Sequence, residues 1–146
     1  MDVRPDFPLP DTAWPGTREY WAGAARGQLC IPRCELCARW VWYPEPSCPH
    51  CSGDRLRWTA VSGRGSLFSW TIVHHPFLPQ FRAKLPYVAA LVSLEEDPRV
   101  RIVTSVVECG PSELRPELPV EVVFRPLEFP GIARTVIAPM FKPAAR

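Results

Sequence analysis

The sequence predicts a mainly β protein with a short N-terminal helix, a clip built on four cysteines, and a five-stranded barrel. Nineteen prolines among 146 residues argue against a helical bundle, because proline is excluded from helix interiors. Two Cys-x-x-Cys pairs predict the clip. Beyond residue 63, apolar and polar residues alternate with a period of two, which is typical of strands.

Composition limits the possible classes of protein. A hydrophobic fraction of 47% and a charged fraction of 22% are typical of a globular chain. The formal net charge of +2 is too small to indicate a dedicated nucleic-acid binder. The first residues do not resemble a signal peptide, and the longest apolar stretch, residues 87–94, is too short to span a bilayer. We therefore expect a cytoplasmic protein with no membrane segment.

Residues 1–28 are predicted to form an arm followed by a helix. Four prolines within residues 1–15 predict an extended conformation. From Thr17 to Gln28, apolar residues recur at helical spacing and Gly27 offers a natural stop.

The four cysteines form two pairs separated by ten residues: Cys34-Glu-Leu-Cys37 and Cys48-Pro-His-Cys51. Each pair can form a tight knuckle, and two knuckles can close on one tetrahedral ion. Rubredoxin-type iron is the alternative metal, whereas a redox-active dithiol is disfavoured because the pairs lie too close together to be independent. In a reducing compartment such pairs more often bind metal than form disulfides. We predict a structural zinc ion bound by Cys34, Cys37, Cys48 and Cys51, within a ribbon spanning residues 29–57.

Two strand-like runs lead into the halves of this ribbon, at residues 29–33 and 40–44. Because so small a ribbon has little core, we expect Trp40, Trp42 and Tyr43 to be buried against the metal site or the next domain. Cys30 and Cys109 lie outside the pairs, and we interpret them as buried apolar residues.

Residues 58–146 are predicted to form the barrel. Five main strands after a short one at residues 58–62 favour a small closed or partly open barrel over a sandwich. We expect Phe68, Trp70 and Ile72 on one face of the first main strand, with a bulge or sharp bend between Gly63 and Gly65. The five main strands are expected at residues 64–73, 87–94, 100–107, 120–125 and 132–137.

We predict no catalytic residues. The chain has no G-x-S-x-G elbow, phosphate-binding loop or dinucleotide fingerprint. His74 and His75 are interpreted as strand-end residues rather than bases. An enzyme that acts alone is thus the least favoured class of function.

Residues 74–86 form a long connection that contains three prolines. Long ordered loops on a small barrel often carry the binding function. We therefore expect this loop to contact a partner or ligand through Phe77, Phe81, Arg82 and Lys84.

Basic residues on or beside the strands leave a second hypothesis open. They could form a stripe for phosphate, although a solvated barrel exterior is an equally good interpretation. Together with exposed aromatic side chains, such a stripe would suit a module that binds single-stranded nucleic acid. The residues are Arg99, Arg101, Arg125, Arg134 and Lys142.

The order of these motifs resembles a known family from about residue 16 to residue 141. The family is the acyl-CoA-associated OB-fold proteins with an N-terminal rubredoxin-like zinc ribbon, catalogued as domain of unknown function 35. The motifs are the two cysteine pairs, the step Tyr43-Pro44, the run Ser62-Gly-Arg-Gly-Ser-Leu-Phe-Ser-Trp70, Leu85-Pro-Tyr-Val88 and Leu118-Pro-Val-Glu-Val-Val-Phe124.

The resemblance implies a rubredoxin-like ribbon followed by a five-stranded OB-fold barrel. It also implies a non-catalytic accessory subunit of a thiolase, acyltransferase or steroid side-chain aldolase that acts on carbon–carbon bonds of acyl-CoA thioesters. The thiolase-like partner would supply the catalytic residues within a hetero-oligomer. This subunit would brace the partner and help to shape the channel for acyl-CoA.

The sequence departs from the family pattern at two turns. Ala38 stands where glycine often follows the second cysteine. Pro116-Glu117 replaces the glycine usually found before the strand at Val120, so we expect a different turn there.

Overall fold

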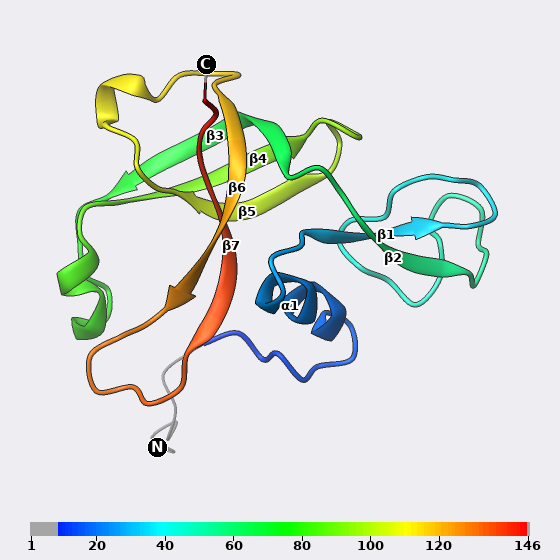
Figure 1. The fold of residues 1–146 in the computed structure, drawn as a ribbon, viewed down its shortest axis with the longest axis horizontal. Coiled ribbons are helices and arrows are strands. Elements are labelled where there is room, and N and C mark those ends of the chain that lie inside the picture. The colour runs from blue at the N-terminus through cyan, green and yellow to red at the C-terminus, as the bar shows by residue number, and fades with distance from the viewer. Residues whose placement is uncertain (1–8, 146) are drawn as a thin grey trace.

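The computed structural model describes residues 9–145, so residues 1–8 of the predicted arm lie outside the described part (Figure 1). Its helix, two-stranded ribbon and closed five-stranded barrel confirm the predicted fold class. The helix α1 spans Arg18–Ala25, and two short 3-10 helices are η1 (Pro79–Lys84) and η2 (Pro111–Glu113). The strands are β1 (Cys30–Cys34), β2 (Leu56–Ala60), β3 (Arg64–Val73), β4 (Tyr87–Leu94), β5 (Arg101–Val106), β6 (Pro119–Leu127) and β7 (Val136–Pro143).

The ribbon is built on β1 and β2, which pair antiparallel with Cys30 opposite Ala60 and Cys34 opposite Leu56. The strand expected at residues 58–62 begins two residues earlier. The strand-like run predicted at residues 40–44 is wrong, because only a single bridge joins Trp40 to Arg33. Pro44 and Pro46 follow at once and cannot donate the hydrogen bonds that would extend it.

The barrel strands follow the order β3-β4-β5-β7-β6 and close on themselves through β3 and β6. All neighbouring pairs are antiparallel except β5 and β7, which run parallel. Along β5 the predicted alternation holds, since Ile102 and Val106 are buried whereas Arg101 and Val103 are exposed. Period-two patterning therefore placed the correct face of β5 in the core.

A sharp bend and a β-bulge lie at different positions near the start of β3. Gly63 has a positive φ of 79°, which confirms the sharp bend expected there. The bulge lies further along, because the register with β4 shifts between Leu67 and Ser69. Leu67 is fully buried, so the extra residue Phe68 is exposed while Trp70 packs against the core. The expectation that Phe68 shares a face with Trp70 is therefore wrong.

The last strand was predicted too early. Residues 132–135 form a loop, and β7 continues through Pro139 and Pro143 instead. The carbonyls of Pro139 and Phe141 accept hydrogen bonds from Thr104 Oγ1 and Val107 N, so these alternate β7 residues direct their backbone groups toward β5. On the side of β7 that faces β5, few backbone hydrogen bonds form. The prolines lack an N–H on this side, so their presence costs few hydrogen bonds and the strand tolerates them.

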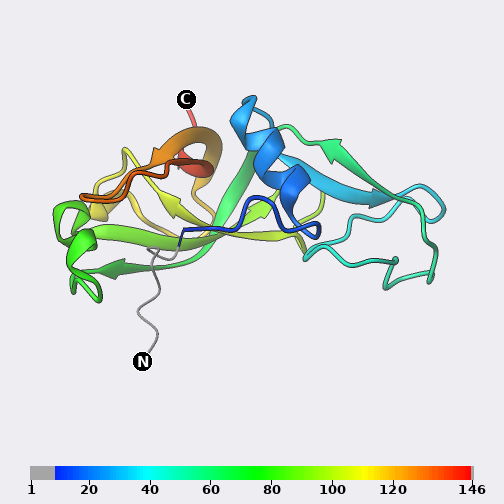
Figure 2. The same ribbon diagram turned by 90° about the horizontal axis from the view of Figure 1, so that it is seen from below.

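Helix α1 lies between the ribbon and the barrel, where it packs against β7, β1 and β2 (Figures 1 and 2). Tyr20 of the helix, together with Leu29 and Ile31 of the ribbon segment, belongs to the same buried cluster as the barrel residues Leu67 and Phe141. Ribbon and barrel thus share one core. Within residues 9–145, no helix has the length and apolar character required to cross a membrane.

Candidate functional site

The four paired cysteines converge at the far end of the ribbon. Their sulfur atoms all lie within 4.8 Å of one another, with Sγ–Sγ distances of 3.6 Å for Cys34–Cys51 and for Cys37–Cys48. A tetrahedral ion with metal–sulfur bonds of about 2.3 Å requires sulfur atoms about 3.8 Å apart. The donor set and its spacing therefore fit one four-thiolate metal ion.

Backbone geometry holds the sulfur atoms in place. The N–H groups of Cys37 and His50 point at the sulfur atoms of Cys34 and Cys48, with N–Sγ distances of 3.5 and 3.4 Å. Cys34 and Cys48 are buried with Val41 in a small cluster of their own. Each knuckle ends in a left-handed residue, Ala38 or Ser52, directly after its second cysteine.

The thiols differ in how easily they ionise without a cation. The N–H of Cys37 is the main cause that lowers the pKa of Cys34, to about 7. The N–H of Gly53 lowers the pKa of Cys51, but the sulfur of Cys34 and burial outweigh it and raise that pKa to about 12. Four thiolates so close together repel one another, and a divalent cation removes that penalty.

The predicted contact loop forms η1 at one end of the barrel. Phe77 is 77% exposed and meets the ring of His75 edge-on, with ring centroids 5.1 Å apart. Phe81 turns the other way, and its ring lies 4.9 Å from Phe129 and 5.8 Å from Tyr87. The loop therefore presents one aromatic side chain to solvent and packs the other against the barrel.

Beside Phe81 lies an apolar cavity of about 540 Å³. Lys84 also lines it, whereas Phe77 and Arg82 do not. The remaining walls come from Pro86, from strands β4, β5, β6 and β7, and from the segments that follow β5 and β6. Sequence reasoning missed Phe129 and Met140 as wall residues, because only barrel closure brings them beside the loop.

A second apolar surface lies where the helix, ribbon and barrel meet. Trp14, Tyr43 and Val103 are 54%, 58% and 64% exposed and line one groove together with Trp42. The expectation that Tyr43 is buried is thus wrong, because Trp42 occupies the inner position against Tyr20, with ring centroids 5.3 Å apart. The signal for Val103 was present in the sequence, since alternation placed it on the same outward face as Arg101.

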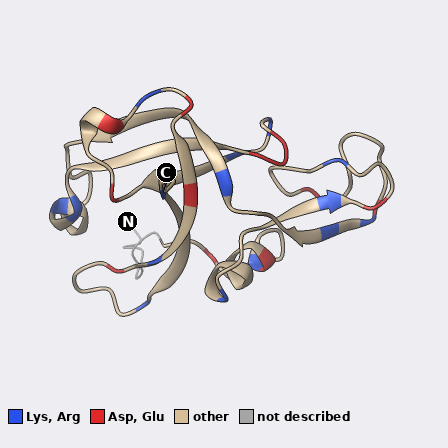
Figure 3. Cartoon of the chain, turned by 45° about the horizontal axis from the view of Figure 1, so that its top comes forward, with Lys and Arg blue, Asp and Glu red and all other residues tan. Residues whose placement is uncertain are grey.

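The basic residues proposed as a phosphate stripe are engaged within the chain, and Figure 3 shows both charge signs interspersed over the elements. Arg99, Arg125 and Lys142 pair with Asp97, Glu108 and Glu121. Arg101 covers the ring of Phe68 at 3.9 Å from its centroid. Arg134 donates to the carbonyl oxygen of Pro10 and to Thr12.

Cys30 and Cys109 differ in burial. Cys30 is 3% exposed, as expected of a small apolar core residue. Cys109 is only partly buried in the cavity wall, and burial followed by the nearby Glu113 raises the pKa of its thiol. A thiol with a raised pKa is a poor nucleophile at neutral pH.

Two domain families match consecutive parts of the chain. Residues 21–57 match the rubredoxin-like zinc ribbon domain of ChsH2, and residues 58–125 match its C-terminal OB-fold domain. A DUF35 domain-containing scaffold protein from Methanothermobacter thermautotrophicus is 32% identical over 108 residues, which cover 73% of this chain and 78% of that protein. The chain belongs to the DUF35 family.

Two further relatives extend the comparison. A scaffold protein from Methanocaldococcus jannaschii is 32% identical over 68% of this chain and 69% of its own length. A probable enoyl-CoA hydratase alpha subunit from Thermomonospora curvata is 33% identical over 86% of this chain. The present chain spans only 37% of that relative's length.

Two solved structures share the fold. A chain of the Ltp2-ChsH2(DUF35) aldolase is 30% identical and superposes with a TM-score of 0.77, covering 90% of this chain and 96% of that one. A DUF35 protein of unknown function from Sulfolobus solfataricus superposes with a TM-score of 0.58 at 14% identity, over 92% of this chain and 89% of its own. The second likeness concerns the fold alone.

Proposed function

We propose that this DUF35 chain is a non-catalytic accessory subunit of a thiolase-superfamily complex that acts on carbon–carbon bonds of acyl-CoA thioesters. The complex would be a thiolase, an acyltransferase or a steroid side-chain aldolase. The observation that carries the proposal is the 30% identity over 90% of the chain with a chain of the Ltp2-ChsH2(DUF35) aldolase. In this role the chain braces its thiolase-like partner, which supplies the reacting groups, and helps to shape the acyl-CoA channel.

The arrangement of reactive side chains supports an accessory role. His74 and His75 are both exposed, and the ring of His75 lies against Phe77. The Cys109 thiol, whose pKa is raised, is poorly suited to attack a thioester. Nothing in these groups forms the nucleophile–base pair that acyl transfer requires.

The cysteine cluster has a structural role in this proposal. We propose that Cys34, Cys37, Cys48 and Cys51 bind one structural zinc ion. Four thiolates fill a tetrahedral shell, so no position stays open for water or substrate. The ion would join two knuckles that have only a small buried cluster of their own.

The partner surface is assigned to the loop that carries Phe77, Phe81, Arg82 and Lys84. Phe77 is the most exposed large apolar side chain among the described residues, at 77%. Exposed aromatic side chains are frequent anchors of protein–protein interfaces. The internal ion pairs of Arg99, Arg125 and Lys142 disfavour the nucleic-acid alternative, since paired cations are less available to phosphate.

Copurification tests the accessory role. The chain is coexpressed with the thiolase-like proteins of its source genome, and it is expected to elute as one complex with one of them. Phe77→Asp should weaken the association about tenfold or more, because it places a charge in a desolvated contact. Val103→Asp is the matched control, since Val103 is 64% exposed on β5, outside this loop, and should leave binding unchanged.

Three results would contradict this proposal. Failure of the wild-type chain to associate with any thiolase-like neighbour removes the accessory role. Turnover of an acyl-CoA by the pure chain alone would instead make it an enzyme. Salt-dependent binding of oligonucleotides would favour the nucleic-acid alternative.

A further inference from the structure

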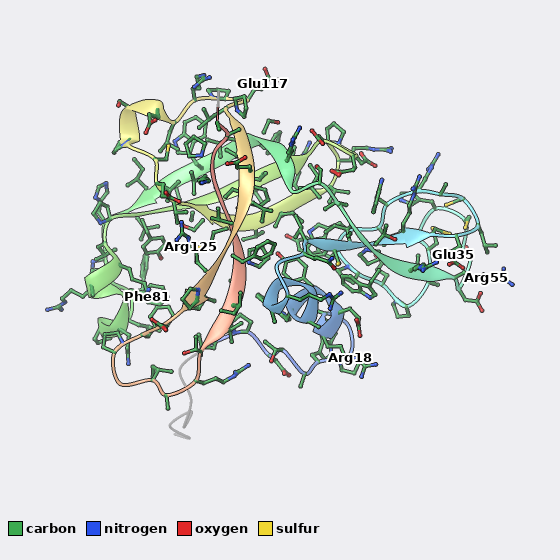
Figure 4. The ribbon with its side chains drawn as sticks, in the orientation of Figure 1. Arg18, Glu35, Arg55, Phe81, Glu117 and Arg125 are labelled. Carbon is green, nitrogen blue, oxygen red and sulfur yellow. The ribbon has the colours of Figure 1, made fainter. Side chains whose placement is uncertain are left out.

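The cavity at the η1 end of the barrel has the properties of a small-molecule site. Its volume of about 540 Å³ falls in the range of about 300–1,000 Å³ that such sites occupy. Three aromatic rings gather at it: the ring of Phe81 meets that of Phe129 edge-on at 4.9 Å and lies tilted against that of Tyr87 at 5.8 Å. Leu127 and Met140 continue the apolar wall. In Figure 4 the labelled Phe81 and Arg125 mark this end of the barrel.

Only two of the side chains that line the cavity are charged, and they differ in their partners. Glu108 accepts a hydrogen bond from Arg125, so its charge is compensated. Lys84 has no carboxylate partner within residues 9–145, and its Nζ lies over the ring of Phe129 at 4.9 Å from the centroid. The cavity therefore combines a largely apolar interior with one uncompensated cation.

This combination selects a class of ligand. An apolar tail gains by leaving water for the aromatic and aliphatic walls. A terminal carboxylate gains an ion pair with Lys84, at a place where the wall offers no competing anion other than the paired Glu108. Neutral ligands would lack the second contribution.

We propose that this cavity binds a medium-chain aliphatic carboxylate, with its tail between Phe129 and Met140 and its carboxylate against Lys84. The proposal goes beyond the accessory role and does not depend on it, because the cavity is formed by this chain alone. It is therefore tested on the isolated, zinc-loaded chain.

Calorimetric titration with hexanoate, octanoate and decanoate, each below its micelle concentration, measures the contribution of the tail. Each pair of added methylenes should tighten binding about fifteenfold until the cavity is full, since burial stabilises by about 0.8 kcal/mol per methylene. Absence of saturable binding for all three acids overturns the proposal, as does an affinity that does not depend on chain length.

Substitution of Lys84 tests the contact with the carboxylate. Lys84→Met keeps the aliphatic stem and should weaken octanoate about fivefold while leaving 1-octanol unchanged, because only the acid pairs with the cation. Arg115→Met is the control, since Arg115 is an exposed cation that does not line the cavity. Equal effects of Lys84→Met on acid and alcohol would overturn the assignment of the head group.

The thiol of Cys109 reports where the ligand lies. Saturating octanoate should slow alkylation of Cys109 by iodoacetamide, followed by mass spectrometry of its peptide, because the thiol lines the same cavity. Binding that leaves this rate unchanged would place the ligand elsewhere and overturn the proposal.

Discussion

Among residues 9–145, four non-glycine residues adopt positive φ angles, and two of them follow the second cysteine of a pair. Ala38 is held at a φ of 63° because its N–H donates to the carbonyl of Cys34 while its own carbonyl accepts from Arg33. Glu117 has a φ of 62° in the turn before β6, where the family pattern has glycine. Both positions thus have positive φ angles, which glycine adopts without steric strain.

Ala38→Gly should stabilise the metal-loaded protein by about 0.5–1 kcal/mol, because glycine adopts the left-handed conformation without the steric penalty of Cβ. The greater freedom of glycine in the unfolded chain offsets part of the gain. Urea unfolding measures the change. Ala22→Gly, on the exposed side of α1, is the control and should destabilise by about 1 kcal/mol. A loss of similar size for Ala38→Gly would refute this interpretation of the knuckle.

Asp97 organises the connection between β4 and β5. It accepts hydrogen bonds from the backbone N–H and the guanidinium of Arg99, and the guanidinium is the main cause that lowers the pKa of Asp97. A lowered carboxyl pKa means that the stabilisation is complete above the ordinary pKa of about 3.9 and is lost as the pH falls through the folded value.

Arg99→Met should therefore raise the pKa of Asp97 toward about 3.9. Carbon-13 NMR of the Asp97 carboxyl measures this directly, even where acid also releases a thiolate-bound metal. Arg115→Met, an exposed arginine in a distant loop, should leave the pKa unchanged. An unchanged value in Arg99→Met would show that the ion pair does not form in solution.

At the scale of elements, the ribbon depends on its knuckles more than on its two strands. Cys48→Ser should abolish stoichiometric zinc binding, measured by elemental analysis, and should broaden the amide NMR signals of residues 34–55. Cys109→Ser is the control and should keep the metal, because Cys109 lies outside the cluster. A folded, metal-free Cys48→Ser protein would contradict the ligand assignment.

Elements with a strong local signal could be predicted from the sequence. The spacing of the cysteines predicted the sulfur cluster, an almost continuous apolar run predicted β4, and alternation predicted β5 closely. Prediction failed for β7, because Pro139 and Pro143 look like strand breakers until the sparse pairing on one side of the strand is known. It also failed at the bulge of Phe68, which reverses the face of one residue without any change in composition.

For the whole molecule, the cavity could not be predicted because its walls are distant in sequence. Tyr87 and Phe129 come together only when the barrel closes, and Met140 lies on a strand that was predicted in the wrong place. The sequence predicted a contact role for the loop at η1 from its length and its aromatic residues, which are local features, and Phe81 and Lys84 of this loop line the cavity. Sequence thus indicated one wall of the cavity, and tertiary structure supplies the others.

The parallel contact between β5 and β7 has a dynamic consequence. It joins the strands through a single register pair, Val106 with Phe141, supported by the Val107 amide and the Thr104 hydroxyl. Few hydrogen bonds must break for β5 and β7 to separate along this seam. The barrel should therefore open locally between these strands before it unfolds as a whole. Val107 and Met140 line the cavity from opposite sides of the seam. The motion that loosens the barrel is therefore also the one that widens the entrance to its interior.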